Sequence, residues 1–179
     1  MFFIRYIKLF IGLIIFLSFN FSCTNNIKSS ERINDSFNYR ELDVFMNDSV
    51  EKPMILNQNF IENFNSWELV RSIEITSKIK DNDTETFPFV VESIALGLDK
   101  VKFENAPEDL NVPQIIGRFR VYKTNILKIN SIDLSIDNLV EYKNNLKKLI
   151  SSHNALVNML NLTANELEQE SLINQDQGF

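Results

Sequence analysis

Few residues in this sequence are of the types that catalysis or metal binding requires. The 179 residues include a single cysteine, Cys23, and a single histidine, His153. One residue of each type cannot supply the ligands of a zinc site, and no serine or carboxylate lies in a recognisable nucleophile-and-base pattern. We therefore expect a protein that is not an enzyme and that carries no metal or other cofactor.

His153 is the side chain whose unperturbed pKa lies closest to neutrality. It falls inside an apolar seven-residue repeat, where a histidine is usually packed and held by a hydrogen bond. The alternative is a small-ligand-binding module, in which a pocket between helices near His153 holds an apolar or anionic molecule.

A basic segment could provide further contacts. Arg118 and Lys123 belong to a stretch that has no acid between Gln114 and Ser131. They could meet a ligand or an anionic partner, although such a run also fits a solvated helix face. Gly117 precedes them in mid-helix at a cost of roughly 1 kcal/mol relative to alanine. Close contact with another helix, or more rarely a ligand, would explain that glycine.

The N-terminus has the pattern of an export signal. Arg5 and Lys8 precede an apolar run over residues 9–21. This run is shorter than the roughly 20 residues that a membrane-spanning helix needs. Cys23 follows two positions later. The alternative is that Cys23 is an incidental thiol beside a secretory leader or an uncleaved signal anchor.

Cys23 stands in the sequence Phe21-Ser22-Cys23. This segment resembles a bacterial lipobox of the looser kind found in Bacteroidota. The resemblance implies that residues 1–22 are a lipoprotein signal peptide and that Cys23 becomes the lipid-modified mature N-terminus. Two or three acyl chains, such as palmitate, would then anchor the protein permanently in a membrane.

The charge balance restricts the partners. Removing the leader removes Arg5 and Lys8 but no acid, so the formal charge would change from −6 to −8. An acidic protein does not suit nucleic-acid binding. We expect a lipid-anchored protein of the bacterial cell envelope, facing the periplasm or the exterior, that acts through contacts with an envelope protein.

Hydrophobic periodicity predicts an all-α fold. An Asn65 and Glu68 capping box begins the first helix, and the last helix carries the repeat that contains His153. Short loops favour an antiparallel up-down-up-down four-helix bundle. The predicted helices cover residues 66–80, 86–106, 112–131 and 136–161.

The remaining segments complete the expected organisation. Residues 24–46 are polar and asparagine-rich without a sustained period. We expect residues 23–52 to be a flexible tether, and deletion of residues 24–46 to leave folding nearly unchanged. The bundle domain is expected over residues 53–165 and a frayed acidic tail over 166–179. The last helix is longer than its predicted neighbour, so we expect residues 53–64 to cover its apolar end beside His153. The alternative is that this end is itself the partner-binding surface.

Overall fold

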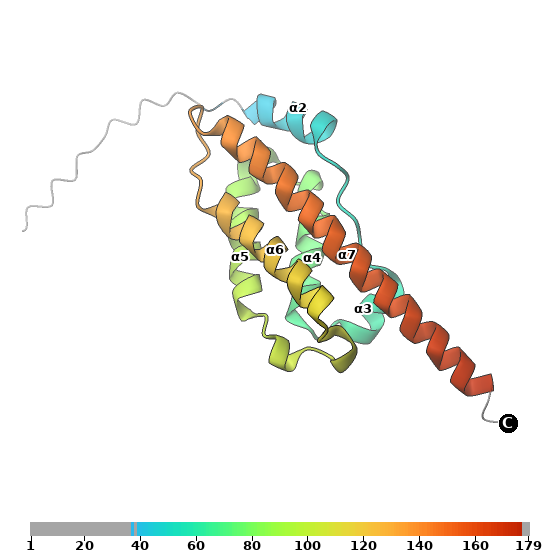
Figure 1. Cartoon of the computed structure of the whole chain (residues 1–179). Helices are drawn as coiled ribbons and strands as arrows, with labels where there is room; N and C mark the ends of the chain where they lie inside the picture. The colour runs from blue at the N-terminus through green and yellow to red at the C-terminus, as the bar shows by residue number, and fades with distance from the viewer. Residues whose placement is uncertain (1–36, 38, 177–179) are drawn as a thin grey trace, which may run out of the picture. The chain divides into compact units, whose positions relative to one another are not determined.

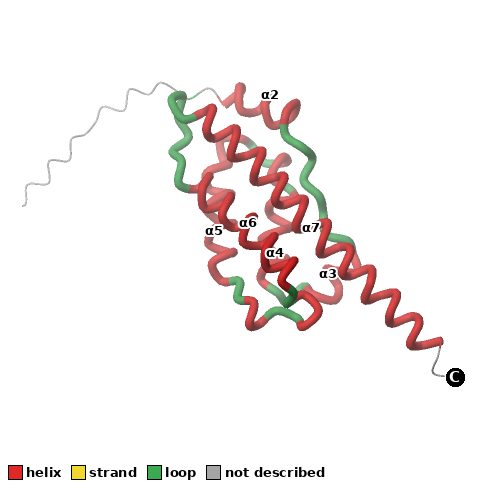
Figure 2. Tube along the Cα trace, in the orientation of Figure 1, coloured by secondary structure: helices red, strands yellow, loops and turns green. Residues whose placement is uncertain are grey.

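The computed structural model describes residue 37 and residues 39–176, and every regular element in that part of the chain is helical (Figures 1 and 2). The predicted all-α class is confirmed. The α-helices are α2 (Tyr39–Ser49), α3 (Gln58–Phe64), α4 (Glu68–Ser77), α5 (Phe87–Lys100), α6 (Pro113–Asn130) and α7 (Leu139–Asp176). Short 3-10 turns are η2 (Ile79–Asp81), η3 (Thr84–Thr86), η4 (Phe103–Asn105) and η5 (Glu108–Leu110).

Proline sets the start of two helices. Pro88 lies in the first turn of α5 and Pro113 in that of α6, where the missing N–H has no intrahelical partner in any case. The start of α4 differs from the prediction. Asn65 ends α3 in helical conformation, and α4 begins at Glu68 after Trp67. The predicted Asn65 capping box is therefore wrong, because the preceding residues already form a helix.

The core lies where α4, α5, α6 and α7 pack on their sequence neighbours. The repeat of α7 supplies fully buried side chains at Leu146, Leu149, Leu156 and Leu160. Helices α4 and α5 approach closely at Gly97, where an added Cβ would lie 2.6 Å from Ser72 Oγ. An alanine there would press on the Ser72 hydroxyl, so this hydroxyl would have to rotate away.

Helix α2 forms inside the segment that we expected to be a tether. Leu42, Met46 and Val50 recur every four residues and are all buried. Glu41 Oε1 lies 2.6 Å from Lys143 Nζ near the start of α7. The expectation that this segment has no apolar face to bury is therefore wrong for residues 39–50. The stripe is short and polar residues interrupt it, so the sequence pattern was weak.

The chain between α2 and α3 runs along α7 (Figure 2). We call residues 51–57 the strap. Leu56 in the strap and Phe60 in α3 are buried, and the Met54 carbonyl oxygen lies 2.9 Å from His153 Nε2. The predicted packing of residues 53–64 beside His153 is confirmed.

Helix α7 is longer than predicted. It continues from Leu139 to Asp176, so the expected end at residue 161 is wrong, and residues 166–176 are helical where fraying was expected. Neither proline nor glycine interrupts residues 161–176. The last turns of α7 reach beyond the other helices (Figure 1).

Candidate functional site

Cys23, the expected lipid attachment site, lies outside the described residues. The lipid anchor therefore stays a prediction from the leader sequence. Within the part of the chain that the structure describes, no helix is both long and apolar enough to span a membrane.

His153 is fully enclosed by the fold. A carbonyl oxygen only accepts hydrogen bonds, so Nε2 carries the proton that is donated to Met54 O. Nδ1 is then a buried acceptor with no hydrogen-bond partner among the described residues. Burial lowers the pKa of His153 to about 4, and the bond to Met54 opposes this shift only in part. The ring is neutral at pH 7 and out of reach of a ligand.

A short chain of buried polar groups lies next to His153. The Tyr122 ring centroid is 5.8 Å from that of His153, and the Tyr122 hydroxyl is hydrogen-bonded to Thr76 Oγ1. Thr76 donates to the Ser72 carbonyl oxygen, so the Tyr122 hydroxyl is the donor to Thr76. Burial raises the pKa of Tyr122 well above its usual range. This chain is closed and neutral, which suits core packing and not acid–base catalysis.

Two asparagines of α7 hold the strap through its backbone. Asn154 accepts from Met54 N at 2.7 Å and donates to Lys52 O at 3.1 Å. Asn161, about two turns later in α7, makes an equivalent pair of bonds. It accepts from Asn57 N at 2.8 Å and donates to Ile55 O at 3.0 Å. Each amide thus satisfies the backbone groups of two strap residues that are two positions apart.

Sequence reasoning missed this role of the asparagines. Asparagine is abundant throughout the chain, so no single one stood out. The available signal was spacing, because Asn154, Asn161 and Asn165 lie seven and four residues apart and so share a helix face. The third also participates, since Asn165 Oδ1 accepts from Asn57 Nδ2 at 2.9 Å.

The two basic candidates separate in the structure. Lys123 Nζ lies 2.8 Å from Asp99 Oδ1 and also donates to Leu98 O at the end of α5. Arg118 is exposed and borders a small groove between α6 and α7. His153, Arg118 and Lys123 therefore do not converge on one site in the structure, because His153 is closed inside the core.

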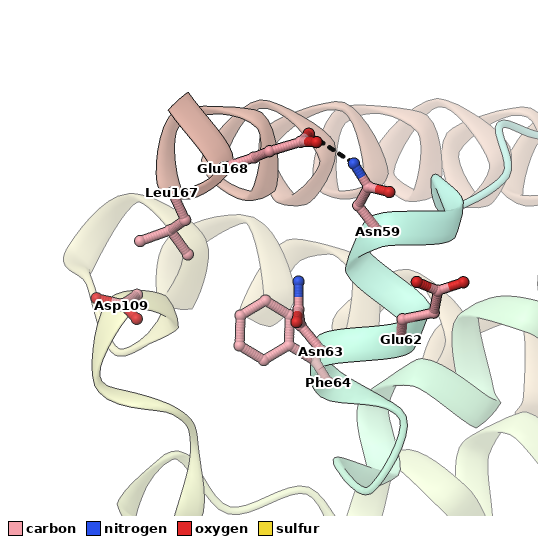
Figure 3. A pocket seen from close by; sticks show the side chains of 7 residues that line it. All are labelled: Asn59, Glu62, Asn63, Phe64, Asp109, Leu167 and Glu168. Atoms are coloured by element: carbon pink, nitrogen blue, oxygen red, sulfur yellow. Dashed lines mark hydrogen bonds between the residues drawn. The ribbon is translucent and has the colours of Figure 1, made fainter. Parts of the chain in front are cut away.

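The candidate functional site is a hollow of about 530 Å³ between α3, η5 and the C-terminal part of α7 (Figure 3). Phe64 of α3 and Leu167 of α7 are half-buried and border the same space, with Asp109 of η5 at its edge. Asn59 donates to Glu168 at 2.6 Å and so links α3 to α7 above it. The lining residues are Asn59, Glu62, Asn63, Phe64, Asp109, Leu167 and Glu168.

The hollow combines acidic side chains with two apolar ones, Phe64 and Leu167. Three carboxylates line it, from Glu62, Asp109 and Glu168, together with no basic side chain. Among the described residues, neither Glu62 nor Asp109 has a salt bridge. The described residues contain no group of three or more histidine, cysteine or acidic side chains arranged to hold a metal ion. The arrangement suits a cationic group on an apolar stem.

Comparison with known proteins adds no assignment. No family model matches the chain, and neither the curated proteins nor the solved structures gave a match. The functional argument therefore rests on the residues of the chain itself.

Proposed function

We propose that this chain is a lipid-anchored protein of a bacterial cell envelope that acts through protein contacts and not through catalysis. In this proposal Cys23 carries the lipid, and α4 to α7 form an up-down-up-down bundle as the scaffold. The protein partner presents a lysine or arginine to the acidic hollow.

The observation that carries the proposal is that Phe64 and Leu167 lie beside the carboxylates of Glu62 and Asp109, which have no salt bridge among the described residues. Lysine and arginine side chains pack their aliphatic stems on apolar surface while the charged end stays at a polar rim. The Phe64 ring and Leu167 offer that surface, and Asp109 and Glu62 offer the opposite charge. Charge complementarity of this kind selects a partner and speeds its association.

Helix α2 and the hollow lie at opposite ends of α7. Glu41 pairs with Lys143 near the start of α7, whereas Asn59 pairs with Glu168 near its end. These two contacts are about 37 Å apart along the helix. The described part of the chain thus begins near the end of α7 that lies opposite the hollow.

The small-ligand alternative lacks comparable support. It requires a concave pocket that His153 lines, and the His153 ring has no exposed surface. Reaching the ring would require the strap to leave α7, which breaks the backbone pairs to Asn154 and Asn161.

Anchoring is tested by Cys23→Ala in the full chain. Detergent phase separation should find the wild type in the detergent phase and the variant either unprocessed or released. Equal partitioning of the two proteins, with the leader still attached, would favour the uncleaved signal anchor.

Partner binding is tested by photo-crosslinking in intact cells of the producing bacterium. A photoreactive residue at Leu167 should give an adduct with another protein, and one at the exposed Phe89 of α5 should not. Asp109→Lys should reduce the Leu167 adduct about tenfold by reversing the rim charge. An adduct of equal yield from both positions, or one that persists in Asp109→Lys, would contradict the proposed site.

A further inference from the structure

The groove between α6 and α7 contains a glycine that the chain itself does not explain. Gly117 is exposed in mid-helix, where glycine costs roughly 1 kcal/mol relative to alanine. A Cβ added there would meet no atom of another described element within 4 Å. Gly97, by contrast, is explained by Ser72 at 2.6 Å. The space above Gly117 therefore suits the close approach of another molecule.

The surroundings of Gly117 form a shallow surface of small and basic residues. The groove has a volume of about 160 Å³ and is lined by Gly117, Arg118, Val121, Ser152 and Ala155. Val121 is 57% exposed although it is apolar. We call this surface the α6/α7 groove.

One cation, Arg118, lines the α6/α7 groove. A second, Lys148, is exposed one helical turn before Ser152 on α7. Asn125 donates both to Lys148 O and to Ser152 Oγ, which joins α6 to α7 at this point. Neither cation has an ion pair within the described part of the chain. The groove thus favours an apolar and acidic occupant.

The end of α7 presents a surface of that composition. Leu162, Glu166, Gln169 and Ile173 are spaced by four, three and four residues, so they lie on one face of the helix. Leu162 is 49% and Ile173 is 56% exposed, and Glu170 lies beside them. No lysine or arginine occurs after residue 148. We call Leu162, Glu166, Gln169 and Ile173 the α7 stripe.

The α7 stripe cannot reach the groove of its own chain. Helix α7 is continuous from Leu139 to Asp176, so Ser152 and Glu166 are held about 21 Å apart along one rigid helix. We infer that the α6/α7 groove binds the α7 stripe of a second copy of this chain. In a two-fold symmetric pair, each copy provides its stripe and receives that of its partner. This inference goes beyond the proposed function, because it uses neither the acidic hollow nor its partner.

The test uses the full chain, co-expressed in its membrane with two different affinity tags. One copy carries Val121→Cys in the groove and the other carries Ile173→Cys in the stripe. A short bis-maleimide should join the two copies into an adduct that carries both tags. The control pair, Phe89→Cys and Ile173→Cys, should give an adduct in about tenfold lower yield. This control also measures any background reaction of Cys23.

Substitutions in the groove and the stripe distinguish a lost contact between copies from a loss of folding stability. Gly117→Ala should raise the thermal midpoint, because alanine favours the helix, and yet it should lower the adduct yield. Arg118→Glu should lower the yield about tenfold, and Glu166→Lys in the other copy should restore it. A yield equal to that of the Phe89 pair, no loss with Gly117→Ala, or no rescue by Glu166→Lys would each overturn the inference. An adduct with a different protein at Val121 would also overturn it.

Discussion

The two parts of α7 belong to one helix but are held by different forces. Residues 139–160 bury an apolar repeat in the core, with Leu146 and Leu156 fully enclosed. Residues 161–170 are mostly exposed and include three glutamates and no basic residue, and on one face they make hydrogen bonds to the strap and α3. The comparison teaches that α7 is stabilised by packing in its first part and is available for contacts in its second.

The largest expected effect comes from truncating the packed part. Leu146→Ala removes a fully buried side chain and should reduce the free energy of unfolding by roughly 2 to 5 kcal/mol. Leu172→Ala, on the exposed part, should change it by less than about 0.5 kcal/mol. Denaturant titration of both variants measures the difference. Similar losses for the two variants would mean that the end of α7 is also buried against something.

Lowering the pH should destabilise the packed part of α7 through protonation of His153. The pKa of His153 is about 4 in the folded state against an ordinary value of 6.5, so the unfolded chain binds the proton more readily. The contribution of neutral His153 to the free energy of unfolding is therefore fully present above pH 6.5. It decreases by about 3 kcal/mol as the pH drops toward 4.

Carboxylates also titrate in this range, so the measurement is a difference between two proteins. Unfolding free energies of the wild type and His153→Gln should be measured from pH 7 to pH 4. The wild type should lose stability more steeply, and the gap between the two should narrow with acid. Parallel curves would show that His153 is not the group that senses the acid.

The strap contacts should contribute less. Asn161→Ala removes two hydrogen bonds to the strap backbone and should cost roughly 1 to 2 kcal/mol. Asn158→Ala is the matched control, because Asn158 is exposed and alanine is a better helix former. Thermal unfolding should therefore show a lower midpoint for the first variant and an unchanged or higher one for the second. Equal midpoints would show that the asparagine pairs do not hold the strap.

The smallest expected effect concerns the ion pair that joins α2 to α7. Glu41→Gln should cost about 0.5 kcal/mol at low salt, and the cost should shrink as salt screens the pair with Lys143. The control is Glu74→Gln, because Glu74 of α4 is exposed and has no ion pair among the described residues. A salt-independent loss in Glu41→Gln would assign the effect to packing and not to charge.

Much of the helical pattern was predictable because it repeats over long distances. The seam around His153 spans several turns of one helix, and Pro113 marks the start of α6 in the sequence as it does in the structure. Helix α2 was missed because it buries only Leu42 and Met46, which is too short a repeat to stand out from a polar segment. The end of α7 was missed because its exposed residues show little apolar period.

The candidate site was less predictable than the helices. His153 was correctly placed in the apolar seam, but its hydrogen bond goes to the Met54 carbonyl, 99 residues away in the sequence. The acidic hollow joins Phe64, Asp109 and Leu167 from three separate elements, so no local pattern predicts it.

The sequence by itself determined the helical class, the apolar face of α7 and the acidic charge, because each depends on residue type and local spacing. The tertiary structure decided which asparagines bind the strap, which cation of α6 is paired and where the hollow lies. Those outcomes depend on which segments, far apart in the sequence, lie close together in space. Two side chains of the same type therefore have different roles when their neighbours in space differ. Lys123 pairs with Asp99 whereas Arg118 borders the α6/α7 groove, because the two residues lie on different faces of one helix.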